Sequence, residues 1–146
     1  MRWLMIIVGG LVLVVGMVVA LGAMLPRHHQ VSRTLRVKRS PAEVWPVLLQ
    51  ATQASAVPVD VLERRPPHRL ITRVTETEKN FGGTWTIAID ATPPSGSSIT
   101  ITEDGWVANP IFRFVSRFVI GHHATLDGLL KQVAKTLNEE PALSGE

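Results

Sequence analysis

His122 is the residue in this sequence best suited to chemistry near neutral pH. Imidazole titrates at about pH 6.5, so this side chain could serve as a general acid or base, or as a donor that orients a ligand. Its position falls at the centre of the apolar face of an expected helix. A lone histidine on such a face is often a core residue bonded to a strand hydroxyl, and the sequence leaves both interpretations open.

The other acidic and imidazole side chains form weaker combinations. His123 points about 100° away from His122 around a helix, which disfavours a shared metal ion, and the chain has no HExxH motif and no cysteine. Glu103 and Asp104 are neighbours on an expected strand and so face opposite sides, which favours a place beside a turn over paired carboxylates. We therefore expect no metal and no cofactor.

Two arginines and two further histidines complete the candidates. Arg113 and Arg117 are one helical turn apart and could bind a phosphate or a carboxylate, or could form a solvated helix face. His28 and His29 follow the apolar N-terminal segment directly, where we expect them to be solvated.

A long C-terminal helix must position most of these residues. Asn109 is a suitable N-cap and Pro110 suits the first helical position, and the helical pattern then continues to about Asn138. Phe118 and Leu126 lie on its apolar face, opposite a charged face. Gly121 costs the helix about 1 kcal/mol relative to alanine, which predicts a bend or a close approach.

The segments before this helix predict an antiparallel sheet. A strand over 31–38 leads into a helix that starts at the capping box Ser40-Pro41-Ala42-Glu43. Four strands follow, over 57–64, 70–77, 84–92 and 99–107, and loops this short require antiparallel neighbours. The expected fold class is α+β, with about five strands packed on the long helix.

The N-terminal segment predicts a single-pass membrane anchor over 1–25. From Trp3 to Leu25 no side chain is polar, and 23 helical residues span roughly 35 Å, enough for a hydrocarbon core of about 30 Å. The small residues at Ala20-Leu21-Gly22 leave a cleaved signal as the alternative. Basic residues outnumber acids after the span, which favours a cytoplasmic domain, with extracytoplasmic placement as the alternative.

The rest of the chain divides into a linker (26–30), one domain (31–138) and a tail that we expect to be disordered (139–146). The net charge of +3 does not indicate nucleic acid, because the basic residues are scattered and the aromatic residues are few. A run of basic residues close to the anchor suits an anionic membrane surface, at about 1 kcal/mol per residue. The absence of cysteine suits either redox compartment.

Five short motifs occur in a familiar order along the domain. They are Ser40-Pro41-Ala42-Glu43-Val44-Trp45, Glu63 to Leu70, Phe81 to Trp85, Thr100 to Gly105, and Asn109 to Phe114 continued by Gly121-His122. Together they resemble the polyketide cyclase/dehydrase and lipid-transport superfamily (START-like, Bet v 1-like, SRPBCC) over residues 31–138. The resemblance implies a helix-grip fold, in which the sheet holds a long C-terminal helix with hydrophobic ligands between them.

The chain departs from that family between its first helix and the Pro66-Pro67 turn. Family members place a second short helix and two more strands there, whereas this chain has only residues 51–56. We therefore expect a shallower and more open groove. The strand over 57–64 would then be an exposed edge, able to pair with another chain or to face the bilayer.

The function expected from these features is membrane-anchored binding of a hydrophobic small molecule or lipid. The groove would be lined by Trp85, Ile87, Trp106, Phe118, His122 and Leu126, with His122 as the polar orienting group. One alternative is a cyclase or dehydratase enzyme that uses His122 as acid and base. Another is a non-catalytic module that forms homo-oligomers through its edge strand.

Overall fold

The computed structural model describes residues 1–55, 58–75, 81–121 and 123–145 of the 146-residue chain. Its elements, in chain order, are α1 (Arg2–Met24), β1 (His28–Val37), α2 (Pro41–Gln53), β2 (Val59–Arg65), β3 (Arg69–Val74), β4 (Phe81–Thr92), β5 (Gly96–Val107), α3 (Pro110–Val115), the π-helix η1 (Ser116–Ile120), α4 (Ala124–Thr136) and β6 (Ala142–Ser144). The strands form one antiparallel sheet in the order β2-β3-β4-β5-β1-β6. The predicted α+β fold is confirmed, with six strands where about five were expected.

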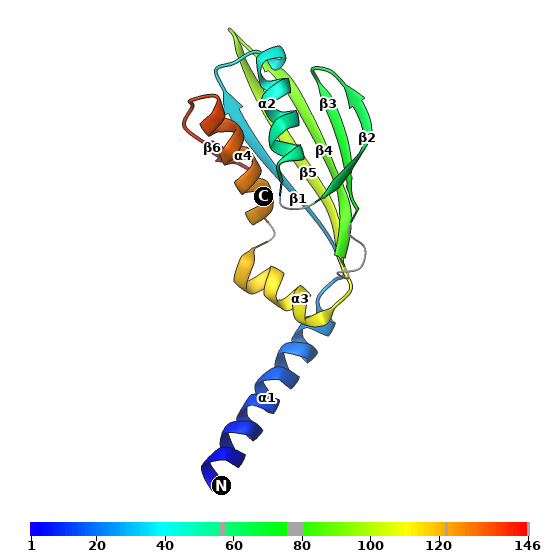
Figure 1. Ribbon diagram of the computed structural model, residues 1–146, viewed down its shortest axis with the longest axis vertical. Helices are drawn as coiled ribbons and strands as arrows, with labels where there is room; N and C mark the ends of the chain where they lie inside the picture. Colours follow the sequence, from blue (N-terminus) through cyan, green and yellow to red (C-terminus); the bar gives the residue numbers. More distant parts are fainter. Residues whose placement is uncertain (56–57, 76–80, 122, 146) are drawn as a thin grey trace.

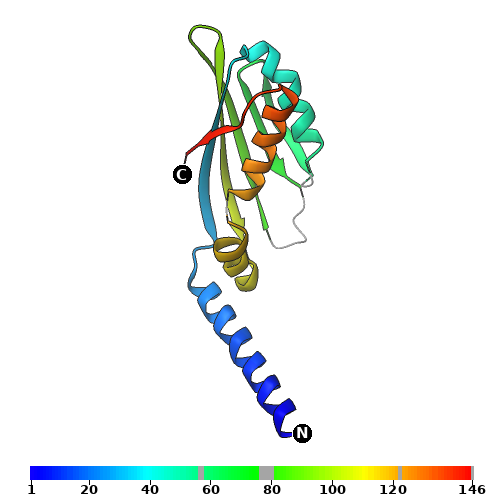
Figure 2. The ribbon, with the colours of Figure 1, turned by 90° about the vertical axis from the view of Figure 1, so that its left-hand side faces the viewer.

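The molecule has an extended shape because α1 projects away from the sheet (Figure 1). In the described part of the chain, α1 is the one helix long and apolar enough to cross a membrane, and a signal sequence would have the same length and composition. Helix α3 lies across the junction between α1 and the sheet, and α2 and α4 cover one face of the sheet (Figures 1 and 2).

Both ends of the domain are more ordered than the sequence predicted. Strand β1 begins at His28, three residues before the expected start, because His28 and His29 pair with Trp106 and Gly105 of β5. The expected linker over 26–30 is therefore partly strand. The tail expected to be disordered contains β6, whose Leu143 pairs with Leu35 of β1.

The core lies between the sheet and the helices α2 and α4. Strand positions that face the helices alternate with positions that face outward, as shown by the fully buried Ile87 and Ile89 of β4. Outward positions carry hydroxyl groups, and Ser32 and Thr34 of β1 bond to Thr102 and Thr100 of β5. The fully buried apolar side chains include Leu35, Val44, Leu48, Leu70, Ile87, Ile89, Ile99, Ile101, Leu126, Leu130 and Val133.

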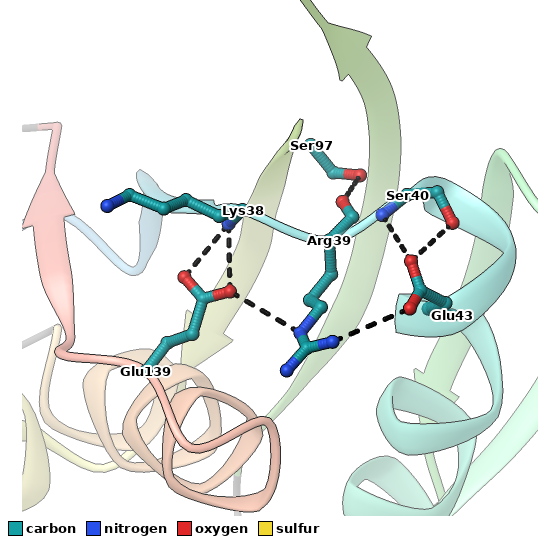
Figure 3. A network of polar contacts seen from close by, with 6 residues as sticks. All are labelled: Lys38, Arg39, Ser40, Glu43, Ser97 and Glu139. Atoms are coloured by element: carbon teal, nitrogen blue, oxygen red, sulfur yellow. Dashed lines mark hydrogen bonds and ion pairs between the residues drawn. The ribbon is translucent and has the colours of Figure 1, made fainter. Parts of the chain in front are cut away.

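A polar network joins β1, α2 and α4 at the end of the sheet far from α1 (Figure 3). Both carboxylate oxygens of Glu139 accept from the Lys38 amide, at 2.9 and 2.8 Å. Arg39 lies between Glu139 and Glu43, at 3.8 and 3.7 Å. Glu43 accepts from the Ser40 amide and hydroxyl, so the predicted return contact of the capping box is present. These two hydrogen bonds, the amide foremost, lower the pKa of Glu43 below its ordinary value.

The C-terminal helix is broken, whereas the sequence predicted one helix over about 109–138. Helix α3 continues into the π-helix η1, which ends at Ile120, and α4 begins at Ala124. Gly121 has φ of 82° and ψ of 140°, a conformation that L-residues rarely adopt, so the helix cannot continue through it. A Cβ there would meet nothing within 4 Å, so of the two predicted roles for Gly121 the bend is the one observed.

Candidate functional site

The six residues predicted to line a groove lie in different environments. Trp85, Ile87 and Leu126 belong to the closed core, with 2, 0 and 0 % of their surface exposed. The space between α4 and the sheet is therefore filled by the protein's own side chains at these positions. Phe118 lies on η1 with 62 % of its surface exposed, and His122 lies outside the described residues.

Trp106 belongs to the other face of the sheet. It pairs with Gly82 of β4, and Glu103 and Gly105 of β5 face the helices, so Trp106 faces away from them. Its indole ring packs on Gly82, where a Cβ would lie 3.0 Å from the ring. Trp85 and Trp106 therefore do not share a groove wall, and ligand contact by either residue stays a prediction.

A polar cluster that the sequence did not indicate lies on the helix-facing side of the sheet near α1. Oε2 of Glu103 accepts a 3.0 Å hydrogen bond from the Trp85 indole, and Oε1 lies 3.3 Å from Nε2 of His29. Glu103 is in mid-strand and partly buried, so the expected position beside a turn is wrong. His29 is also partly buried, which corrects its expected solvation.

Glycine in β5 makes room for the imidazole of this cluster. His29 pairs with Gly105, and a Cβ at position 105 would lie 2.7 Å from the imidazole Cε1 and Nε2 atoms. Real Cβ contacts are not this short, so any other residue at 105 would displace His29. The fold thus holds the ring against the sheet beside Glu103.

An ion pair connects the sheet to α4. The Nε and Nη2 atoms of Arg33 donate to the two carboxylate oxygens of Asp127, at 2.6 and 3.2 Å, and Nη1 donates to the carbonyl of Gly145 at 2.8 Å. Both partners are about four-fifths buried. Bidentate contacts of this kind are among the stronger hydrogen bonds in proteins, so this pair fixes the start of α4 on β1.

A pocket of about 140 Å³ opens where α1, β1, β5 and α3 meet. Three arginines and one histidine line it, and no carboxylate does. The lining residues are Leu25, Pro26, Arg27, His29, Val107, Arg113, Ser116 and Arg117. The predicted anion-binding candidates Arg113 and Arg117 therefore do meet, and Arg27 of the segment after α1 joins them.

Arg113 is the buried member of this group. It is 7 % exposed, and its Nη1 and Nη2 atoms donate to the carbonyls of Leu25 and Ala108, at 2.7 and 3.2 Å. Its Nε atom has no hydrogen-bond partner among the described residues. The side chain is held in place by α3, whose start is capped as predicted by Asn109 Oδ1, 2.9 Å from the Ile111 amide.

Glycine also permits the contact that forms this junction. Gly22, near the end of α1, is buried against Pro110 at the start of α3, and a Cβ at position 22 would collide with the Pro110 carbonyl. The approach brings the Leu25 carbonyl within reach of Arg113. The pocket therefore depends on α1 being present and packed on α3.

Exposed apolar side chains cover the segment next to the pocket. Val119 and Ile120 of η1 are 72 and 61 % exposed, and Ile111 and Phe112 of α3 are also exposed. The Phe118 ring packs on Phe114, with 5.0 Å between centroids. We call the surface formed by Ile111, Phe112, Phe118, Val119 and Ile120 the junction surface.

The described side chains of this region offer groups that could bind a ligand. The pocket offers cationic donors, the junction surface offers apolar area, and the cluster around Glu103 is already satisfied by its own partners. Within the described ranges, no three histidine, aspartate or glutamate side chains gather in a way that could hold a metal ion.

Similar solved structures share the fold of this chain at low sequence identity. A conserved protein from Geobacillus kaustophilus has a TM-score of 0.62 at 12% identity, over 79% of this chain and 99% of its own. A protein from Mesorhizobium loti has a TM-score of 0.56 at 10% identity, over 75% and 97%. One from Rhizobium leguminosarum has a TM-score of 0.53 at 15% identity, over 74% and 95%. These matches establish the α+β fold alone.

No known protein family matches the sequence, and no curated protein matches it.

Proposed function

We propose that this protein is a membrane-anchored START-like domain that binds a lipid or another hydrophobic small molecule at the end of the sheet next to α1. The observation that carries the proposal is the position of the open pocket. It lies directly after the apolar helix α1 and beside the exposed junction surface, whereas the space under α4 is closed by core side chains.

The junction surface supports a bilayer as the source of the ligand. Large side chains such as Phe118, Val119 and Ile120 are unfavourable in water by about 25 cal/mol for each Å² of apolar area. A contiguous exposed apolar surface commonly marks a binding or membrane surface. Because α3 packs against α1, these side chains would lie at the membrane boundary, where hydrocarbon can cover them.

The START-like assignment rests on the order of the five motifs and on the antiparallel sheet covered by a C-terminal helix. The break at Gly121 changes how such a fold would hold its ligand. Helix α4 closes the part of the sheet far from α1, and α3 with η1 turns aside toward α1. An apolar molecule would therefore be held at the open end, next to the bilayer.

The enzyme alternative depends on His122, which lies outside the described residues. It predicts that the bound molecule is converted to a product. His122→Ala should then abolish conversion and leave binding and folding intact, whereas a binding protein should keep the molecule unchanged in both forms.

The edge-strand alternative has one favourable observation and two against it. Strand β2 is at the sheet edge, and its Val61 and Leu62 are exposed. However, the register shifts between Val61 and Glu63, and Glu63, Arg64 and Arg65 place charges along the strand. Irregularity and charge both oppose strand pairing between molecules, so this alternative is disfavoured.

Native mass spectrometry of the full-length protein tests the proposal. The protein would be released from lipid nanodiscs, and the retained molecules identified after extraction. Ser116→Phe should fill the pocket and abolish retention, whereas Thr136→Phe, on the exposed side of α4, should not. Retention of nothing by the native protein, or equal retention by both variants, would contradict the proposed site.

A further inference from the structure

Arg113 combines deep burial with an unsatisfied charge. Its two carbonyl partners, Leu25 and Ala108, are neutral, and its Nε atom has no partner in the described part of the chain. No described carboxylate forms an ion pair with it. A buried charge without a counter-ion is strongly unfavourable, so the site is incomplete as it stands.

Arg33 is an arginine of the same fold whose charge does have a counter-ion. It is also partly buried, but Asp127 supplies two carboxylate oxygens to its guanidinium. Around Arg113 the chain supplies more positive charge instead, because Arg27 and Arg117 line the same pocket. Glu103 contacts His29 at the pocket wall but does not line the pocket. The described residues therefore supply no counter-ion to Arg113, and a bound anion would supply one.

The size and place of the pocket define the chemistry of that anion. About 140 Å³ is several times the roughly 30 Å³ of one liquid water and well below the roughly 300 to 1,000 Å³ of typical ligand pockets. It suits a compact group such as phosphate, and the apolar part of a larger ligand would extend beyond it. Because the pocket follows the C-terminal end of α1, it lies at the depth where lipid headgroups begin.

We propose that Arg113, with Arg27 and Arg117, binds the phosphate group of an anionic amphiphile whose apolar part contacts the junction surface. The planar guanidinium suits contact with phosphate oxygens, and each of its two Nη atoms has one N–H donor beyond the carbonyl bond that it makes. Arg27 and Arg117, the exposed arginines of the pocket, would attract the phosphate electrostatically without fixing its orientation. The inference rests on the proposed lipid binding and specifies the headgroup of the ligand.

Titration of the full-length protein in zwitterionic detergent tests this site by calorimetry. The probes are a short-chain phosphatidic acid, the matching diacylglycerol without the phosphate, and inorganic phosphate. We expect phosphatidic acid to bind about 10- to 100-fold more tightly than diacylglycerol, the range of one or two charge-assisted hydrogen bonds. Binding of inorganic phosphate with equal affinity would identify a free phosphate as the source and support the same site.

Charge-matched variants separate a binding role from a structural one. Arg27→Gln and Arg117→Gln change exposed side chains and should each weaken phosphatidic acid binding by about 3- to 10-fold. Arg73→Gln, an exposed change on β3 that removes the same charge, should have no effect. Arg113→Gln should abolish the preference over diacylglycerol, and Arg113→Lys should restore part of it.

Three results would overturn the inference, and each has a different cause. Equal affinity for phosphatidic acid and diacylglycerol would reject the phosphate site and leave the proposed lipid binding in place. If Arg113→Gln fails to fold while Arg27→Gln and Arg117→Gln keep the native preference, Arg113 serves only to hold the end of α1. Binding of neither amphiphile would reject the proposed function itself.

Discussion

At the scale of single residues, the helix-facing side of the sheet carries charges that simple alternation would assign to apolar side chains. Ile99, Ile101 and Glu103 alternate on β5, and Val31 and Arg33 do so on β1. A charged residue in the apolar phase of a strand requires a partner, and Glu103 and Arg33 have theirs. These two residues place charges among the apolar side chains of this face of the sheet.

The Arg33–Asp127 pair predicts a clear effect on stability. Asp127→Asn keeps the shape of the side chain but leaves the partly buried guanidinium without an opposite charge, so we expect a loss of about 1 to 3 kcal/mol in unfolding free energy. Denaturant unfolding of the full-length protein in detergent measures it. Lys131→Gln, an exposed change on the same helix, should stay within about 0.5 kcal/mol. Equal effects of the two variants would show that the ion pair is not stabilising.

Residue patterns predicted some of these positions and missed others for definable reasons. The Asn109 cap and the return contact of Glu43 depend on local spacing, and both were predicted correctly. The role of Glu103 was missed because its adjacency to Asp104 suggested a place beside a turn, although the predicted strand over 99–107 already contained both residues. The phase of Glu103 with Ile101 was the signal that could have located it.

At the scale of elements, the C-terminal segment shows the limit of periodicity. The apolar pattern continues through 109–138, so it predicts one helix. Such a pattern carries no information about the backbone angles at a single position. The helix breaks at Gly121, because the positive φ of this residue ends η1 and turns the chain before α4. The break is what separates the closed core under α4 from the open pocket beside α3.

Two glycines near this break should respond oppositely to alanine. Gly121→Ala places a Cβ on a residue with φ of 82°, and we expect a loss of about 1 to 3 kcal/mol in unfolding free energy. Gly128 is an exposed helical residue of α4 with nothing within 4 Å of its Cβ position, so Gly128→Ala should gain up to about 1 kcal/mol. Thermal unfolding in detergent compares them, and a stabilising Gly121→Ala would contradict the observed backbone.

The contact between α1 and α3 predicts a second opposite pair. A Cβ at position 22 would collide with the Pro110 carbonyl, whereas the Cβ position of Gly16 on the same helix has nothing within 4 Å. Gly22→Ala should therefore displace α3 at a cost of about 1 to 3 kcal/mol, and Gly16→Ala should not. Hydrogen exchange of the α3 amides should accelerate in the first variant alone. Unchanged exchange in both would show that α1 and α3 are not packed together.

At the scale of the whole molecule, the sequence predicted the parts better than their arrangement. An apolar helix, an antiparallel sheet and an edge strand were all expected, because each depends on local pattern. The packing of α3 against α1 was not, since residues 22 and 110 are far apart in sequence and nothing in a single chain records their contact. That contact joins α1 to the pocket, and it brings the Leu25 carbonyl within hydrogen-bond distance of Arg113.

Depth in the bilayer is the property that this arrangement predicts most directly. If α1 spans the membrane and α3 packs at its end, the junction surface must lie in the interfacial region with its apolar side chains in hydrocarbon. The chain has no cysteine, so single-cysteine variants can carry a spin label without further changes. Phe118→Cys reports on the junction surface, and Lys131→Cys reports on an exposed position of α4.

In nanodiscs, the label at 118 should be more accessible to oxygen, which concentrates in hydrocarbon, than to a water-soluble nickel complex. The label at 131 should show the reverse order. If both labels are aqueous while α1 remains in the bilayer, the junction surface faces water and the lipid route into the pocket is closed. If α1 is absent from the mature protein, it acts as a signal, and Arg113 then loses the Leu25 carbonyl together with the wall of its pocket.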